Sequence, residues 1–203
     1  MEEKKRKIIL YSIVSILILT ELATIIEIFQ IRAYSLLFWA CYFLPIIIII
    51  GLLKKNSSIV LSQIIIFFIP ILLWFVDFVH NIITGNSLLG LLIYLPNSTQ
   101  TILQKIVSTQ HIYTIPLSIL ALFFIKVKKR DYKVLLISLS EIVILFFLSH
   151  LSSEDLNVNC VYHNCSTFPL LNIPWAISWF LIMSAFIFIS YFIINLLLST
   201  KKN

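Results

Sequence analysis

The placement of basic residues between long apolar segments constrains this 203-residue chain more than any other feature. A hydrocarbon core needs about 20 helical residues to be crossed. Thirteen of the fifteen Lys and Arg residues flank apolar segments in alternate gaps, and only Arg32 and Lys105 lie in the other gaps. The segments are residues 8–29, 33–53, 59–78, 107–125, 134–150 and 171–198. The positive-inside rule therefore predicts six crossings with both termini in the cytoplasm, and outer loops at 30–32, 79–106 and 151–170.

Composition supports a membrane protein and argues against two other classes. Hydrophobic residues make up 60% of the chain, charged residues 12%, and the mean hydropathy is +1.03. A soluble domain of this kind would have to expose far too much apolar surface. The net charge of +6 lies in clusters without interleaved aromatic residues, so we expect no nucleic-acid partner. We expect an all-α, multi-pass domain over residues 1–203 in the cell membrane, with membrane lipids as its partners.

Three prolines interrupt the predicted spans. Lipid-exposed backbone must satisfy its own hydrogen bonds, so the spans are predicted to be helices despite their β-branched residues. Pro45, Pro70 and Pro116 are expected to free carbonyl groups and to kink the second, third and fourth spans. The apolar centre of the 79–106 loop, Leu88 to Leu95, is too short to cross and is expected to lie at the interface or to act as a lid.

Four carboxylic acids lie within the spans, namely Glu21, Glu27, Asp77 and Glu141. A carboxylate at membrane depth costs several kcal/mol unless it is paired, hydrated or neutral, and no Lys or Arg lies at matching depth. One interpretation is that each is a protonated carboxyl group that hydrogen-bonds between helices. The other is that these residues line a functional site.

The polarity of the spans favours convergence of these groups near the outer surface. Alternating helix directions place Glu27, Asp77, His80 and His150 there, together with Ser35 and His111. Polar residues also share single faces of their helices. We therefore predict a polar pocket open to the outer leaflet, or, alternatively, polar stripes that only join helices. The residues predicted to line this pocket are Glu21, Glu27, His80, Glu141, His150, Asn157 and Asn159.

Cys160 and Cys165 lie in the predicted outer loop 151–170. Because an outer compartment is oxidising, a disulfide between them is expected in preference to free thiols or a zinc site.

A series of short motifs resembles a group of uncharacterised bacterial multi-pass membrane proteins. The motifs run from Trp74 and Asp77 through Thr84-Gly85-Asn86-Ser87-Leu88-Leu89-Gly90, His111 with Pro116, and Asp131-Tyr132 to Glu154-Asp155-Leu156-Asn157-Val158-Asn159. The resemblance covers roughly residues 74 to 176 and implies a membrane location but no activity.

A second, looser resemblance implies chemistry. The six-span plan, the Arg32-Ala33-Tyr34-Ser35-Leu36 run and His111 five residues before Pro116 look like the androgen-induced FAR-17a-type membrane hydrolases. The resemblance implies that Ser35 is the nucleophile, that His111 is its general base, and that lipid esters or similar lipid-like molecules are the substrate. Asp77 or Glu27 would orient the imidazole. No cofactor is expected.

Three alternatives remain open on the residues alone. A proton- or cation-coupled transporter would use Glu21, Glu141 and Asp77 as its path. A non-catalytic lipid-binding or scaffold protein would hold a lipid at the outer pocket. A metal site would draw its ligands from Asp77, His80, His111 and His150, although their spacing matches no zinc motif.

Overall fold

The computed structural model describes residues 3–32, 34–92, 102–125, 127, 131–166 and 173–199. These residues form helices and loops, with no β-strand among them, which confirms the all-α class. The elements are α1 (Glu3–Ile31), η1 (Tyr34–Phe38), α2 (Ala40–Leu53), α3 (Ser57–Thr84), α4 (Ile102–Leu122), α5 (Tyr132–Ser149), η2 (Glu154–Leu156), η3 (Val158–Cys160) and α6 (Trp175–Ser199).

Four helices are long and apolar enough to cross a membrane: α1, α3, α5 and the Trp175–Leu197 part of α6. The expected membrane protein is thereby confirmed. Helix α2 is also apolar but has only 14 residues. At about 1.5 Å per residue, it is shorter than a hydrocarbon core about 30 Å thick. Six complete crossings therefore remain a prediction.

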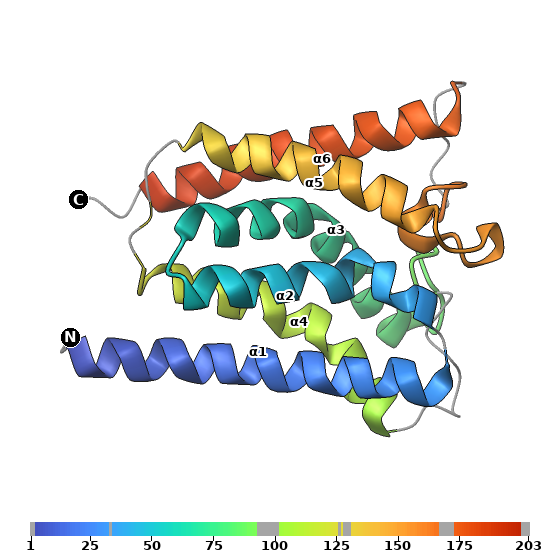
Figure 1. Cartoon of the computed structure of the whole chain (residues 1–203). Coiled ribbons are helices and arrows are strands. Elements are labelled where there is room, and N and C mark those ends of the chain that lie inside the picture. The colour runs from blue at the N-terminus through green and yellow to red at the C-terminus, as the bar shows by residue number, and fades with distance from the viewer. Residues whose placement is uncertain are drawn as a thin grey trace.

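Successive helices run in opposite directions along one bundle (Figure 1). The starts of α1, α3 and α5 lie at the same end as the finishes of α2, α4 and α6. We call this end the basic end, because it carries Lys4, Lys5, Arg6, Lys7, Lys54, Lys55 and Lys133. The opposite end, which holds η1, residues 85–92 and residues 150–166, is the loop end.

The first half of α3 is the centre of the bundle and contacts α2, α4, α5 and α6. The helix starts at Asn56, whose side chain accepts hydrogen bonds from the amides of Ser58 and Ile59 at 3.1 and 3.3 Å. Every residue from 60 to 67 is buried. A helix that is apolar nearly all round is stable only when neighbours cover it on all sides, and here four helices do.

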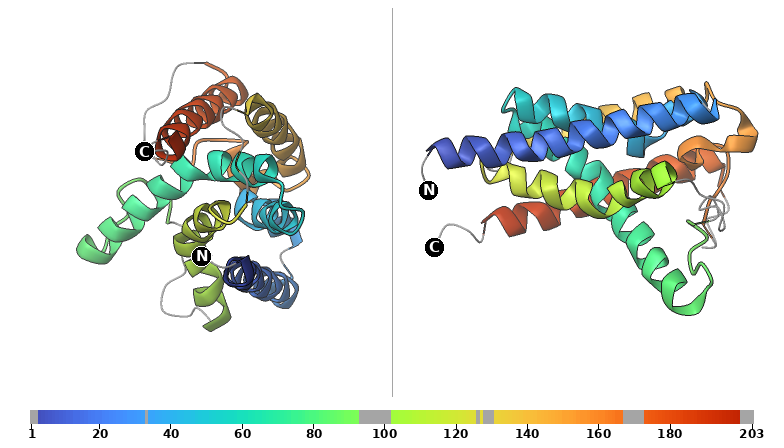
Figure 2. Two further views of the ribbon diagram at one scale, coloured as in Figure 1. Left: turned by 90° about the vertical axis from the view of Figure 1, so that its left-hand side faces the viewer. Right: turned by 90° about the horizontal axis from the view of Figure 1, so that it is seen from below.

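Pro70 divides α3 into two halves. Proline has no N–H for the carbonyl of residue 66 and its ring clashes with that carbonyl, so the helix bends. Beyond Pro70 only Trp74 and Asp77 are buried, and residues 71–84 leave the bundle at an angle (Figure 2). We call residues 71–84 the arm of α3. The arm ends at Gly85, which has a left-handed φ of 75° and donates to the carbonyl of Asn81 at 2.8 Å.

Three of the differences between the helix boundaries and the predicted spans have a local structural cause. The predicted segment 33–53 begins with the short η1 turn, so α2 itself starts only at Ala40. The third helix continues six residues past 78, because Gly85 and not loss of hydropathy ends it. The sixth starts at Trp175, directly after Pro174, whose carbonyl accepts the amides of Ile177 and Ser178. Residues 171 and 172 of the predicted span lie outside the described residues.

Candidate functional site

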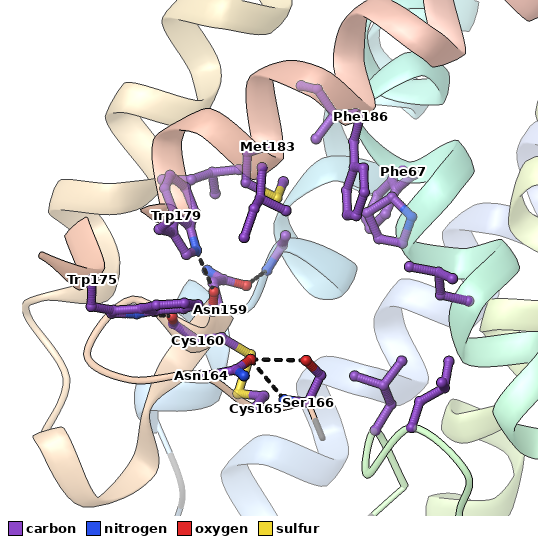
Figure 3. Close-up of a pocket in the computed structure, with 18 residues that line it drawn as sticks. Phe67, Asn159, Cys160, Asn164, Cys165, Ser166, Trp175, Trp179, Met183 and Phe186 are labelled. Atoms are coloured by element: carbon purple, nitrogen blue, oxygen red, sulfur yellow. Dashed lines mark hydrogen bonds between the residues drawn. A yellow bond between two sulfur atoms is a disulfide. The ribbon is translucent and has the colours of Figure 1, made fainter. Parts of the chain in front are cut away.

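A cavity of about 590 Å³ lies between α3 and α6 at the loop end (Figure 3). Its walls are almost wholly apolar, and the bend at Pro70 separates the arm of α3 from α6 there. The lining residues come from the helices (Ala40, Ile66, Phe67, Pro70, Leu73, Leu145, Trp175, Trp179, Ile182, Met183 and Phe186), from residues 85–92 (Leu89 and Leu91) and from residues 157–166 (Asn159, Cys160, Asn164, Cys165 and Ser166).

The Asn159 side chain joins η1, α2 and α5 at one end of this cavity. Its Oδ1 accepts the amide of Ala40 at 2.8 Å, which caps the start of α2, where the N-cap residue itself provides no side-chain bond. Its Nδ2 donates to the carbonyl of Phe38 at 2.8 Å and to Oγ of Ser149 at 2.7 Å. The Asn159 amide is therefore fully bonded, and it fixes α2 and α5 relative to each other.

We call residues 157–166 the roof loop. Within it Cys160 and Cys165 form a disulfide with Cα atoms 5.6 Å apart, which confirms the predicted pair. Asn157 closes the same loop from within, since its Oδ1 accepts the amides of Tyr162 and His163 and its Nδ2 donates to the carbonyl of His163. The disulfide and these bonds together hold the loop over the cavity.

Two tryptophans of α6 fasten the helix to the roof loop. Nε1 of Trp175 donates to the carbonyl of Cys160 at 2.8 Å, and Nε1 of Trp179 donates to the carbonyl of Asn159 at 2.9 Å (Figure 3). Asn159 and Cys160 have φ values of 53° and 59°. This left-handed backbone turns their carbonyls toward α6, and asparagine tolerates it better than most residues do.

We call residues 85–92 the cover segment, and Asp77 holds it against the arm of α3. The Asp77 side chain is completely buried. It accepts hydrogen bonds from Oγ of Ser87 at 2.7 Å and from the amides of Leu88, Leu89 and Leu91 at 2.6, 2.9 and 2.9 Å. Because the cover segment supplies both Leu89 and Leu91 to the cavity wall, Asp77 positions one side of the cavity without lining it.

His80 also contacts the cover segment. Its Nδ1 lies 2.9 Å from the carbonyl oxygen of Asn86 and 3.2 Å from Oγ1 of Thr84. Asp77 and His80 lie one helical turn apart on the arm of α3, and each has a hydrogen-bond partner in the cover segment.

The predicted catalytic group of Ser35, His111 and Asp77 is not joined by hydrogen bonds among the described residues. Ser35 is half-buried in η1. His111 lies on α4 and stacks on the ring of Trp74, with centroids 4.8 Å apart. The carboxylate of Asp77 accepts its four bonds from the cover segment, as described above.

Glu141 does not line the cavity, although it is one helical turn from the lining residue Leu145; it lies in a polar interface between α3 and α5. Nε2 of Gln63 donates to both oxygens of its carboxyl group at 2.7 Å. Toward the basic end, Oγ of Ser138 donates to the carbonyl of Ser62 at 3.2 Å. These bonds match the alternative prediction of polar stripes that join helices.

His150 caps the end of α5 at an exposed position. Its Nδ1 lies 2.8 Å from the carbonyl oxygen of Phe146, and its ring packs on Phe146 and Tyr162. It is not among the residues that line the cavity.

A third polar contact lies where α1 packs on α4. Oγ1 of Thr20 lies 2.7 Å from the hydroxyl oxygen of Tyr113 across this interface. One carboxyl oxygen each of Glu21 and Glu27 is buried without a hydrogen-bond partner, and so are both polar atoms of the Gln110 side chain. The ionisable residues predicted to share one pocket therefore lie in separate groups, and the cavity itself is apolar.

Replacing Gln110 with leucine is expected to raise the free energy of unfolding by about 1 to 2 kcal/mol, because it removes a buried amide that makes no bond. Gln110 is only 2% exposed. Thermal unfolding in detergent, followed by circular dichroism, would measure the change. Gln63→Leu is the matched control: Gln63 is equally buried but donates to Glu141, so this change should destabilise. Similar losses in both variants would contradict the prediction.

The sequence contained partial signals for the cavity. Pro70 indicated a bend in the third span, and Asn159 was predicted to line a pocket and does line this cavity, but neither pattern predicts an apolar hollow. No group of three or more His, Cys, Asp or Glu side chains that could hold a metal ion occurs among the described residues.

Comparison with known proteins adds no assignment. No family model, no curated protein and no solved structure matches this chain. The function has to be argued from the site itself.

Proposed function

We propose that this is a six-span protein of the cell membrane that binds the hydrocarbon chain of one lipid in the cavity between α3 and α6. The observation that carries the proposal is the cavity: about 590 Å³ of space, bounded by apolar side chains of both helices. Ligand sites in proteins usually have about 300 to 1,000 Å³ and mostly apolar walls.

The polar atoms at the roof support binding more than catalysis. The Asn159 amide and both indole N–H groups already donate to protein acceptors. A nucleophile needs a base within hydrogen-bond reach. His111 stacks on Trp74, and the carboxylate of Asp77 accepts hydrogen bonds from the cover segment. We therefore favour a lipid-binding role over hydrolysis by these residues.

The disulfide supports an outer location for the loop end. Disulfides persist on the oxidising side of a cell membrane, and Cys160 and Cys165 are bonded at the end opposite the basic clusters. Basic clusters favour the cytoplasmic side. Both features agree with a cavity in the outer half of the bilayer and with termini in the cytoplasm.

Filling the cavity should abolish binding. Met183→Trp places a larger side chain in the cavity wall, whereas Leu181→Trp adds the same ring at a neighbouring position that is 54% exposed. The probe is 1-hexadecanol, added to protein in detergent while unfolding is followed by circular dichroism. A ligand at 100 times its Kd stabilises the folded state by about 2.7 kcal/mol. Wild type and Leu181→Trp should gain this stability, and Met183→Trp should not.

Equal stabilisation of Met183→Trp would place the probe elsewhere. An unchanged melting temperature of the wild type over the whole range of probe concentration would overturn the proposed function.

A further inference from the structure

The cavity has a polar end at the roof loop and an apolar interior deeper between α3 and α6. We propose that the lipid bound there is uncharged and has a flat ring as its head, which stacks on Trp175. This inference rests on the proposed function and specifies its ligand class.

The first argument is the absence of charge. None of the described residues that line the cavity is Asp, Glu, Lys, Arg or His. A phosphate or carboxylate head buried there would lose its hydration without gaining a cationic partner, which costs several kcal/mol. Proteins that recognise phosphate usually supply Arg or Lys for it. The cavity therefore selects against charged phospholipid heads.

The second argument is that the polar lining atoms are already bonded. Both N–H groups of the Asn159 side chain donate, to Phe38 and Ser149, and its oxygen accepts the amide of Ala40. Oδ1 of Asn164 accepts the amide and the hydroxyl of Ser166, each at 2.9 Å. A headgroup rich in hydroxyl groups would find few partners, so the head that fits needs few hydrogen bonds.

The third argument is the aromatic ring of Trp175, which lines the cavity without another ring stacked on it among the described residues. The Trp179 ring already packs against Phe146 and Phe180, with centroid distances of 5.3 and 5.1 Å. Trp175 lines the same cavity, is half-buried, and makes no ring contact among the described residues. Its N–H is used by Cys160, so the flat face is what it offers to a ligand (Figure 3).

The tail of such a ligand has an equally suitable environment. Met183 and Phe186 of α6 and Phe67 of α3 line the part of the cavity that lies farther from the roof loop than Trp175 (Figure 3). Aromatic and thioether side chains adapt to a flexible hydrocarbon without requiring a fixed shape. A ring at the roof and a chain between α3 and α6 would fill both parts of the cavity.

Binding of three probes to the detergent-purified protein tests the inference. The probes are decylubiquinone, whose head is an uncharged ring, the chain alone as 1-decanol, and a short-chain phosphatidylglycerol with a charged head. Ring stacking contributes about 0.5 to 1.5 kcal/mol, or about twofold to tenfold in Kd. We expect the quinone to bind more tightly than the alcohol by such a factor, and the phosphatidylglycerol to bind most weakly.

Trp175→Gln separates recognition of the ring from recognition of the chain. Glutamine keeps an N–H donor for the Cys160 carbonyl but removes the aromatic face. The variant should lose the advantage of the quinone over the alcohol and keep its affinity for 1-decanol. Phe192→Gln on the same helix, at a position 64% exposed, should change neither value. An intact Cys160–Cys165 disulfide, checked by thiol labelling, would show that the roof loop is retained.

The outcomes distinguish the two proposals. Equal binding of quinone and alcohol by the wild type, or phosphatidylglycerol binding as tight as that of the quinone, overturns the ring inference and leaves chain binding in place. Loss of affinity for both apolar probes in Trp175→Gln also overturns it, because Trp175 would then act on the cavity as a whole. Failure of the wild type to bind any of the probes overturns the proposed function as well.

Discussion

Replacing Asn159 with alanine is expected to lower the free energy of unfolding by about 3 to 5 kcal/mol. The change removes three side-chain bonds and leaves the amide of Ala40 and the carbonyl of Phe38 without these partners. Alanine also tolerates the left-handed φ of 53° at this position less well than asparagine does, which costs about 1 to 2 kcal/mol. At about 2 to 4 °C per kcal/mol for a chain of this size, the melting temperature in detergent should fall by roughly 10 °C.

Asn159→Gly separates the two contributions of this residue. Glycine accepts the left-handed backbone without strain but makes none of the three side-chain bonds. We expect the glycine variant to lie between wild type and the alanine variant, closer to alanine. A melting temperature of Asn159→Ala within a degree or two of wild type would mean that the hydrogen bonds joining α2 and α5 contribute nothing.

Replacing Asp77 with asparagine is expected to release the cover segment from the arm of α3. Asparagine keeps one acceptor oxygen, but its NH2 group would face backbone amides that now donate to the carboxylate. Hydrogen bonds to a charged group contribute about 1.5 to 3 kcal/mol each, and a loss of about 1.4 kcal/mol is a tenfold change in an equilibrium. The cover segment should therefore open at least ten times more often.

The rate of cysteine labelling measures this opening. In a Cys41→Ala background, Leu91→Cys places a thiol in the cavity wall, and its labelling by a maleimide should be at least tenfold faster with Asp77→Asn than without it. Leu88→Cys is the control, because Leu88 is already 49% exposed and should react at similar rates in both backgrounds. Unchanged labelling at position 91 would show that other contacts hold the cover segment.

The features of the fold that the lipid environment determines could be predicted from the sequence. Lipid requires helices and places basic residues at one end, and both the all-α class and the basic end follow from those two rules. The disulfide could be predicted as well, because Cys160 and Cys165 are close in sequence within a loop expected in an oxidising compartment.

The partners of individual polar residues could not be predicted in the same way. Asp77 lies at the depth where a catalytic carboxylate was expected, yet its partners come from residues 10 to 14 positions later in the chain. Only the turn at Gly85 and the backbone of the cover segment bring those amides to it. Helical periodicity gives the direction of a side chain, and it says nothing about how a following loop folds back.

The cavity was missed for a related reason. Hydropathy does not distinguish whether Phe67, Met183 and Phe186 face lipid, the protein core or a cavity, because all three environments are apolar. Whether two such helices touch or separate depends on the angle at Pro70, which the sequence indicates only as a bend of unknown direction. The roof depends in turn on the left-handed positions of Asn159 and Cys160.

The division of α3 into a buried half and an arm has a mechanical consequence. The residues before Pro70 are held on every side, whereas the arm is tied to the rest mainly through Trp74 and the segment bonded to Asp77. A swing of the arm about Pro70 would change the width of the gap beside α6 without disturbing the packing at the other end. Such a swing would let the cavity accept lipids of different width while the first half of α3 stays packed in the bundle.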